Sequence, residues 1–258
     1  METIKKGNKS IDVLSLQCSL GSTLLDGVFG EQTEKLVKTY QKSHGLEDDG
    51  IVGQGTWRSI LAERKKGISD ETWKRIAKNL GVEVAMIKAI YSVESSGASY
   101  LASGYPALLF EAHIFYRELK KIGKNPETLI KNHPSILSKT WNKNLYKGGQ
   151  REVPRINEAW AISPGTALMS ASFGAFQICG FNYKLCGCKN VYEFYREMWI
   201  SEERQLELLG KFLKGLGIVP YMKSKNFSEI ARRYNGSGYK QNKYDTKLKN
   251  AYLRYTQN

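Results

Sequence analysis

The chain has 258 residues, 41% of them hydrophobic, which is enough to bury the core of one or two domains. No run approaches the roughly 18 apolar residues of a membrane span, and the first residues lack the apolar core and cleavage site of a signal peptide, so we expect a soluble product made in the cytoplasm. The net charge of +14 is uneven: residues 1–66 hold 10 Lys/Arg and 9 Asp/Glu, whereas residues 67–258 hold 29 and 16. Such a basic second part favours a polyanionic partner, but its positive residues are scattered and no nucleic-acid motif is present, which disfavours specific nucleic-acid binding.

The cysteines and histidines give no sign of a metal centre. Neither set has the spacing of paired zinc ligands, and the Cys-Gly-Cys segment at 186–188 is not the redox Cys-x-x-Cys arrangement. We therefore expect no metal and no cofactor, with reduced and partly buried thiols. The residues concerned are Cys18, Cys179, Cys186, Cys188, His44, His113 and His133.

The N-terminal part contains an internal repeat. The segment Asp26-Gly-Val-Phe-Gly-Glu-Gln-Thr33 recurs 23 residues later as Asp49-Gly-Ile-Val-Gly-Gln-Gly-Thr56. Each copy predicts a turn at Asp-Gly followed by the start of a helix. With an earlier apolar helix, this gives a three-helix unit of about 60 residues, with helices over 10–20, 31–44 and 54–63.

This doubled pattern, with Tyr-Gln-Lys-Ser-His-Gly-Leu between its copies, resembles the peptidoglycan-binding domain of bacterial wall hydrolases over residues 8–62. The resemblance implies that the first domain binds the cell wall. Asp26, Gly27, Asp49 and Gly50 are its most regular residues. They either contact the sugar or only build the turns, and the second interpretation suffices for each of them taken singly.

We expect domain boundaries at 1–64 and 70–258, joined by a charged linker at 65–69. Ser69 is a good N-cap for the first helix of the second domain. Pro106 and Gly104 predict a loop and one short strand within 98–111, so the domain is mainly α with room for only a small sheet. Its predicted helices cover 70–80, 83–95 (capped by Gly97), 112–122, 126–132, 189–198, 201–214, 228–234 and 244–255.

Glu94 is the candidate acid of this second domain. It ends an apolar helical run and shares a helix face with Val84, Ile87, Ile90 and Tyr91. Partial burial and the carbonyl-rich helix end both raise the pKa of a carboxyl group there. A carboxylic acid that stays protonated near neutral pH suits the general acid of glycosidic bond cleavage, although most glutamates near helix ends are simply solvated.

Four segments strengthen this hypothesis when they are taken together in chain order. They resemble the lysozyme-like transglycosylases and goose-type lysozymes, and more closely the N-acetylmuramidase domain of modular phage endolysins, over about 70–258. A lysozyme-like, α-rich (α+β) fold is implied. The segments are Glu-Ser-Ser-Gly at 94–97, Pro-Ala-Leu-Leu-Phe-Glu-Ala-His-Ile-Phe-Tyr-Arg at 106–117, Ser-Phe-Gly-Ala-Phe-Gln-Ile-Cys-Gly-Phe-Asn-Tyr at 172–183 and Ala-Arg-Arg-Tyr-Asn-Gly-Ser-Gly-Tyr at 231–239.

The resemblance assigns roles within these segments. Glu94 corresponds to the general acid. Gln177 and Asn235 are neutral amides that can bind sugar N-acetyl and hydroxyl groups, and aromatic rings offer flat faces to pyranoses. Asn235 is alternatively a helix C-cap, and Tyr183, like Phe173 and Phe176, is alternatively ordinary core. The tyrosines expected to contact sugar are Tyr183, Tyr234 and Tyr239.

The identity of the second carboxylate is open. Glu111 is the next acid after Glu94 and follows an apolar run, which predicts partial burial. It either activates a water molecule or anchors a structural bond to Arg117, His113 or a backbone amide, and the structural role is favoured.

The predicted function is that of a phage endolysin that cleaves the β-1,4 bond between N-acetylmuramic acid and N-acetylglucosamine. The alternatives are a lytic transglycosylase that forms 1,6-anhydro products, and a non-catalytic wall-binding or virion structural protein. We expect a monomer that acts on the wall after release from the cytoplasm. Its partner is peptidoglycan, and its positive charge suits anionic envelope polymers or lipopolysaccharide.

Overall fold

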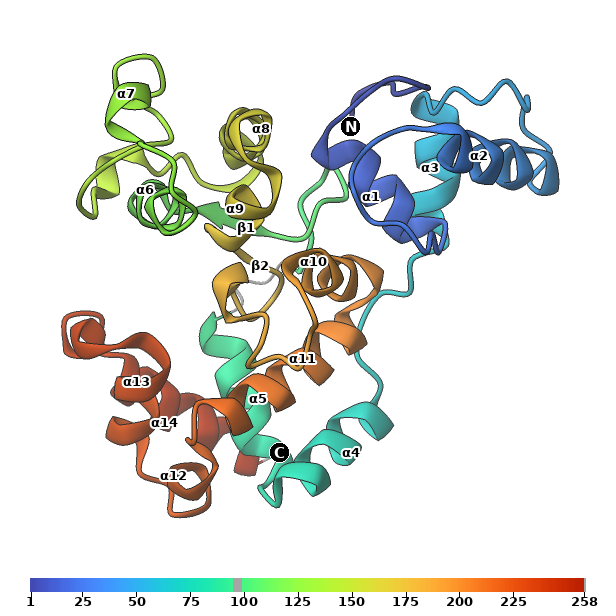
Figure 1. The fold of residues 1–258 in the computed structure, drawn as a ribbon. Coiled ribbons are helices and arrows are strands. Elements are labelled where there is room, and N and C mark those ends of the chain that lie inside the picture. Colours follow the sequence, from blue (N-terminus) through green and yellow to red (C-terminus); the bar gives the residue numbers. More distant parts are fainter. Residues whose placement is uncertain (95–98, 258) are drawn as a thin grey trace.

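The computed structural model describes residues 1–94 and 99–257, which form a mainly helical protein with one small sheet (Figure 1). The helices are α1 (Ile11–Ser19), α2 (Glu31–Ser43), α3 (Gln54–Ala62), α4 (Asp70–Leu80), α5 (Val84–Glu94), α6 (Ala112–Lys121), α7 (Glu127–Ile130), α8 (Val153–Ile162), α9 (Pro164–Met169), α10 (Val191–Ile200), α11 (Glu202–Gly215), α12 (Val219–Lys223), α13 (Phe227–Asn235) and α14 (Tyr244–Thr256). The strands are β1 (Leu108–Phe110), β2 (Ala171–Phe173) and β3 (Ile178–Cys179), and the 3-10 helices are η1 (Lys143–Leu145), η2 (Gly149–Glu152), η3 (Gly180–Asn182) and η4 (Ser237–Lys240). The fold class predicted from the sequence is confirmed.

The first copy of the repeat is organised around a buried glutamine. The Nε2 of Gln17, a residue only 1% exposed, donates to Asp26 Oδ1 at 2.8 Å and to Thr33 Oγ1 at 3.2 Å. Its Oε1 accepts from the Gly27 amide at 2.9 Å. Asp26 Oδ1 also accepts from the amide of Val28 at 2.8 Å, which closes the turn.

The second copy repeats this network. Gln41 donates to Asp49 Oδ1 at 3.1 Å and to Thr56 Oγ1 at 3.3 Å, and it accepts from the Gly50 amide at 3.0 Å. The repeated Asp, Gly and Thr are therefore the partners of a glutamine that lies upstream of each copy. The turn-building interpretation accounts for these hydrogen bonds.

Helix α1 packs on both parts of the molecule. Its Val13 and Leu16 belong to the small N-terminal core, whereas Ile11, Leu14 and Cys18 belong to the large core. Figure 1 shows α1 on the side of the N-terminal helices that faces α10. The N-terminal unit is thus packed against the rest of the chain.

Polar bonds reinforce this contact between α1 and α10. Ser15 Oγ and Tyr195 Oη lie 2.9 Å apart in a buried setting, and Trp199 Nε1 donates to Ser19 Oγ at 2.7 Å. Asp12, which is 2% exposed, accepts a hydrogen bond from Tyr105. Because buried polar groups are costly without partners, these pairs specify one orientation of the contact.

The segment that joins the two parts is fixed by a sandwiched arginine. The Arg64 guanidinium lies 4.2 Å from the ring centroids of both Tyr100 and Trp199 and donates to the Gly104 carbonyl at 2.6 Å. The division into 1–64, a linker at 65–69 and 70–258 stays a prediction, since these contacts cross it.

The small sheet has the order β1-β2-β3 with antiparallel pairing throughout. Leu108 pairs with Phe173, and Ser172 pairs with Cys179. Helices α5 and α14 run side by side below it, so that the end of α5 points towards the sheet (Figure 1). Among the helices described, none is both long and apolar enough to cross a bilayer.

Most helices begin and end within two or three residues of their predicted bounds. The exceptions are α8, α9 and α12, which lie where no helix is predicted. Each has a proline in its first turn, where the missing N–H costs nothing and the fixed φ favours the helix. Proline was therefore a start signal at these three places.

Gly27 tests the packing of the repeat against the second domain. A Cβ at this position would overlap the Trp160 ring and lie 2.9 Å from the Ser10 carbonyl oxygen, whereas one at Gly21 would meet nothing within 4 Å. Both residues have nearly the same positive φ, 68° and 65°. We expect Gly27→Ala to lower the free energy of unfolding by about 1–3 kcal/mol more than Gly21→Ala in urea denaturation. Equal losses would contradict the close packing.

Candidate active site

Glu94 lies at the last residue of α5, on the face that packs into the core. Ile90 and Ile87, one and two turns earlier, are fully buried, while Glu94 itself is half-buried. The predicted Gly97 cap, like the serines at 95 and 96, lies outside the described residues. The carboxyl group is thus taken partly out of water at the end of an apolar helix.

Helix α14 supplies the direct partner of this carboxyl group. The hydroxyl of Tyr244, a residue 6% exposed, donates to Glu94 Oε1 at 2.5 Å. Burial raises the pKa of Glu94 to about 7, and this effect outweighs the hydrogen bonds from Tyr244 and Asn235, which lower it. Glu94 is therefore substantially protonated at neutral pH.

The hydrogen bond engages one of the two carboxyl oxygens. Tyr244 donates to Oε1, and the carbonyl oxygen of a carboxylic acid is the better acceptor. This bond leaves Oε2 available to carry the proton of the acid. A general acid needs such a defined, available proton.

A pair of stacked tyrosines connects Glu94 to the sheet. The rings of Tyr234 and Tyr244 are stacked with centroids 6.2 Å apart and an interplanar angle of 13°. The Tyr234 hydroxyl donates to the Phe176 carbonyl at 3.0 Å, in the turn between β2 and β3. Phe173 and Phe176 are fully buried, as the core interpretation expects.

Gln177 occupies the same turn and has a positive φ of 46°. Its Nε2 donates to the carbonyls of Ala107, at 3.2 Å, and Gly174, at 2.9 Å. Both amide protons are used within the fold, so only its Oε1 is left to accept a bond from a sugar. Gln177 thereby ties the β2–β3 turn to the start of β1.

The other predicted sugar contacts differ in exposure. Asn235 is exposed at the last residue of α13, and the capping position falls on Gly236. Tyr183 is half-buried, whereas Tyr239 is only 8% exposed and presents little of its ring to a ligand. Asn235 is therefore the most exposed of these groups, and it also hydrogen-bonds Glu94.

Glu111 lies at the opposite end of β1, at the N-cap position of α6. Its Oε2 accepts from Tyr146 at 2.5 Å and lies 3.3 Å from His113 Nδ1. Arg117, another predicted partner, pairs with Glu118 instead, at 2.9 Å. The carboxylate is thus held by two side chains, of which only His113 was anticipated.

Comparison with known proteins identifies the family of the chain. The N-acetylmuramidase family matches residues 83–256, and the putative peptidoglycan-binding domain matches residues 16–60. The chain belongs to the N-acetylmuramidase family. The order of the two matched regions is the one expected from the sequence.

A solved structure supports the same placement. The crystal structure of the Burkholderia AP3 phage endolysin is similar to this chain, with a TM-score of 0.68 and 35% identity, and the similarity covers 100% of both chains. The predicted family, fold class and enzyme class, a glycoside hydrolase of the endolysin type acting on peptidoglycan, are thereby confirmed.

A curated relative matches over a shorter length. An uncharacterized protein in the bpoA1 3′ region of Kitasatospora aureofaciens is 38% identical over 61 residues, which are 21% of this chain and 52% of that protein. The chain thus spans about half the length of this curated relative.

Two residues of the muramidase domain were missed by sequence reasoning, Tyr244 and Tyr146. Each is separated from its glutamate by a long stretch of chain, 150 residues for Glu94 and 35 for Glu111. Tyrosines are frequent in the chain, and nothing in their local pattern distinguishes these two. Only the tertiary packing brings them to the carboxylates.

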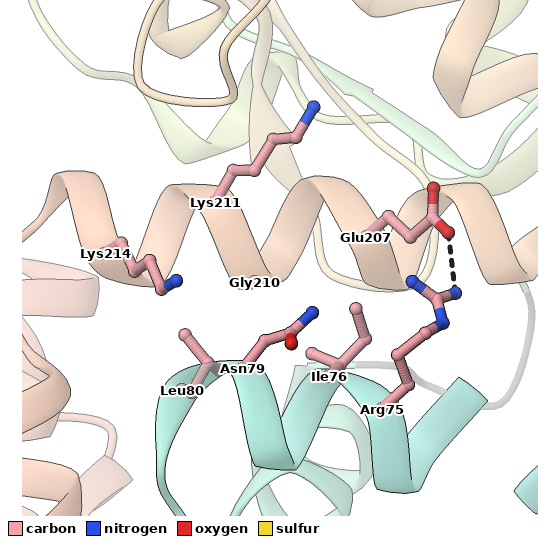
Figure 2. Close-up of a pocket in the computed structure, with 8 residues that line it drawn as sticks. All are labelled: Arg75, Ile76, Asn79, Leu80, Glu207, Gly210, Lys211 and Lys214. Carbon is pink, nitrogen blue, oxygen red and sulfur yellow. Dashed lines mark hydrogen bonds and ion pairs between the residues drawn. The ribbon is translucent and has the colours of Figure 1, made fainter. Parts of the chain in front are cut away.

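The groove between α4 and α11 is a separate feature (Figure 2). An ion pair between Arg75 and Glu207, at 2.7 Å, closes one end, and Lys211 points away from α4. None of the predicted site residues lines it. Within the described ranges, no group of three or more His, Cys, Asp or Glu side chains is placed to hold a metal ion.

Tyr244→Phe tests the control of the Glu94 pKa. Loss of the hydroxyl removes a bond that favours the ionised form, so the pKa of Glu94 rises further above 7. Because the acid must be protonated, activity falls as the pH passes this pKa. We expect the descending limb of the kcat/KM profile on purified peptidoglycan to move to higher pH in Tyr244→Phe.

The matched control is Tyr252→Phe. Tyr252 donates to Glu83 at the other end of the same two helices. Loss of the Tyr252 hydroxyl should leave the descending limb of the kcat/KM profile at its wild-type pH. An unchanged limb in Tyr244→Phe would contradict the assignment of that limb to Glu94.

Proposed function

We propose that the protein is a phage endolysin that hydrolyses the β-1,4 bond between N-acetylmuramic acid and N-acetylglucosamine. The observation that carries the proposal is Glu94, a half-buried carboxyl group with a pKa of about 7 in a domain of the N-acetylmuramidase family. The peptidoglycan-binding domain ahead of it supports the same substrate.

Glu94 acts as the general acid. Its Oε2 proton passes to the glycosidic oxygen as the bond to C1 of the muramic acid breaks, so that the acetylglucosamine leaves with a neutral 4-hydroxyl. Positive charge develops at C1 and its ring oxygen, and a water oxygen then forms the new bond to C1. The proton that this water gives up passes to the solvent, from which the Glu94 carboxylate is protonated again. Tyr244 remains bonded to Oε1 and stabilises the carboxylate that Glu94 becomes.

Glu111 is better suited to anchoring than to activating this water. Its Oε2 is already engaged by Tyr146 and His113, and it lies beyond the end of β1. The turn between β2 and β3 receives the hydrogen bond from Tyr234, the tyrosine stacked on Tyr244. Gln177 in this turn bonds the carbonyl of Ala107, which lies just before the first residue of β1. Strand geometry separates Ala107 from Glu111 by roughly 13 Å. We infer that Glu111 fixes the segment that carries Tyr146.

The charge of the second domain supports an electrostatic contribution to substrate encounter. Its 29 basic and 16 acidic residues would favour approach to anionic envelope polymers, including lipopolysaccharide. The chain would act as a monomer in this scheme, with Asn235 and the Gln177 Oε1 bonding the sugar amides.

Glu94→Gln tests the proposal. The amide keeps the acceptor for Tyr244 but has no transferable proton, so we expect a folded protein whose clearing of purified sacculi falls by at least about 100-fold. The control is Glu83→Gln, which alters the other tyrosine-bonded glutamate at the opposite end of α5 and should keep its activity. Wild-type clearing by Glu94→Gln would refute the role of the acid.

The released muropeptides identify the reaction. Mass spectrometry of the wild-type products should show reducing muramic acid ends, because water is the attacking group. Terminal 1,6-anhydro rings would instead mean that the 6-hydroxyl of the muramic acid attacks, as in a lytic transglycosylase.

A further inference from the structure

The segment between α7 and α8 presents an exposed tryptophan. Trp141 is 59% exposed, more than any other large hydrophobic side chain in the described part of the chain. It lies just before η1, and neither hydrophobic core includes it. An indole left in water contributes little to the core, so its position needs another explanation.

This indole is held in one orientation. Trp141 Nε1 donates to the Tyr146 hydroxyl at 2.6 Å, and Tyr146 in turn donates to Glu111 Oε2 at 2.5 Å. The two rings meet edge to face, with centroids 6.3 Å apart. The polar edge of the indole is therefore bound to the protein while most of the residue remains open to solvent.

The segment itself is pinned by a buried ion pair. Glu152, fully buried, accepts from the amides of Lys147 at 2.6 Å and Gly148 at 2.8 Å, and it pairs with Arg155 at 2.5 Å. Arg155 also donates to the carbonyl of Phe110 in β1 at 2.9 Å. The loop is thus fixed to the sheet, so the ring is presented without a large ordering cost on binding.

A second exposed ring lies beside the same helix. Phe181 is 38% exposed, and the Arg117 guanidinium lies 5.1 Å from its ring centroid. Arg117 follows His113 by one turn of α6, so both occupy one face, and His113 contacts Glu111. Rings, a guanidinium and an imidazole therefore follow one another along this side of α6.

We propose that Trp141, Tyr146 and Phe181, called here the aromatic patch, bind a peptidoglycan glycan strand at a position separate from Glu94. The inference rests on the proposed function. The apolar face of a pyranose stacks on an exposed ring. Because roughly 13 Å of extended chain between Ala107 and Glu111 separates Glu111 from the turn that Gln177 ties to Ala107, the patch holds sugars beyond those at the cleaved bond.

The test compares substrates of two lengths. Kinetics are measured on purified long glycan strands and on the shortest oligosaccharide of the same repeat that the wild type cuts. For Trp141→Ala we expect KM to rise about tenfold on long strands, the loss typical of removing a buried aromatic contact in an interface. We expect kcat, and both constants on the short oligosaccharide, to be unchanged.

Tyr255→Ala is the matched control. Tyr255 is 38% exposed, like Phe181, and lies on α14, away from the loop before α8, so its loss should leave both substrates unaffected. Thermal unfolding of each variant checks that the fold persists. The wall-binding domain is common to all variants and cancels in the comparison.

The outcomes separate the two proposals. If the wild type cuts neither the long strands nor any oligosaccharide of the same repeat, the proposed function fails. If the wild type cuts both and Trp141→Ala keeps the wild-type KM on long strands, the aromatic patch is not a glycan site. An equal rise of KM on both substrates would place Trp141 at the cleaved bond and overturn a separate position.

Discussion

The packing of α14 on α5 is the constraint on which the site depends. It withdraws the Glu94 carboxyl from water and brings the Tyr244 hydroxyl to its Oε1. This arrangement has an energetic cost. Because the pKa is about 7 in the folded protein and about 4.5 in the unfolded chain, the native state binds more protons between these values. The stability contributed by this group therefore falls as the pH rises from about 4.5 to 7. The raised pKa that keeps the acid protonated thus lowers the stability of the folded protein at neutral pH.

The rest of the molecule is connected to this helix pair through a few specific contacts. Tyr234 stacks on Tyr244 and bonds the β2–β3 turn, and the sheet extends from there to Glu111 and the segment that carries Trp141. On another side, α10 receives α1 of the N-terminal unit. Wall binding and bond cleavage are thus supported by one packed framework.

The sequence predicts what depends on local pattern. The three N-terminal helices, the helix that ends at Glu94 and the partial burial of that residue follow from apolar periodicity and turn residues. The proline-started helices were missed because proline was not taken as a start signal. The partners of the glutamates, Tyr244 and Tyr146, depend on contacts between distant segments, which periodicity does not encode. For the same reason, the sequence did not predict that both amide protons of Gln177 bond backbone carbonyls or that Tyr239 is buried.

The pKa of Glu94 is the quantity on which the mechanism depends most directly. Carboxyl ¹³C chemical shifts of the full-length protein labelled at glutamate, compared with the spectrum of a Glu94-substituted protein, isolate its titration. A midpoint near 7 is the result that the structure predicts. A midpoint near 4.5, the ordinary value for glutamate, would leave Glu94 ionised at neutral pH and would contradict its role as the general acid.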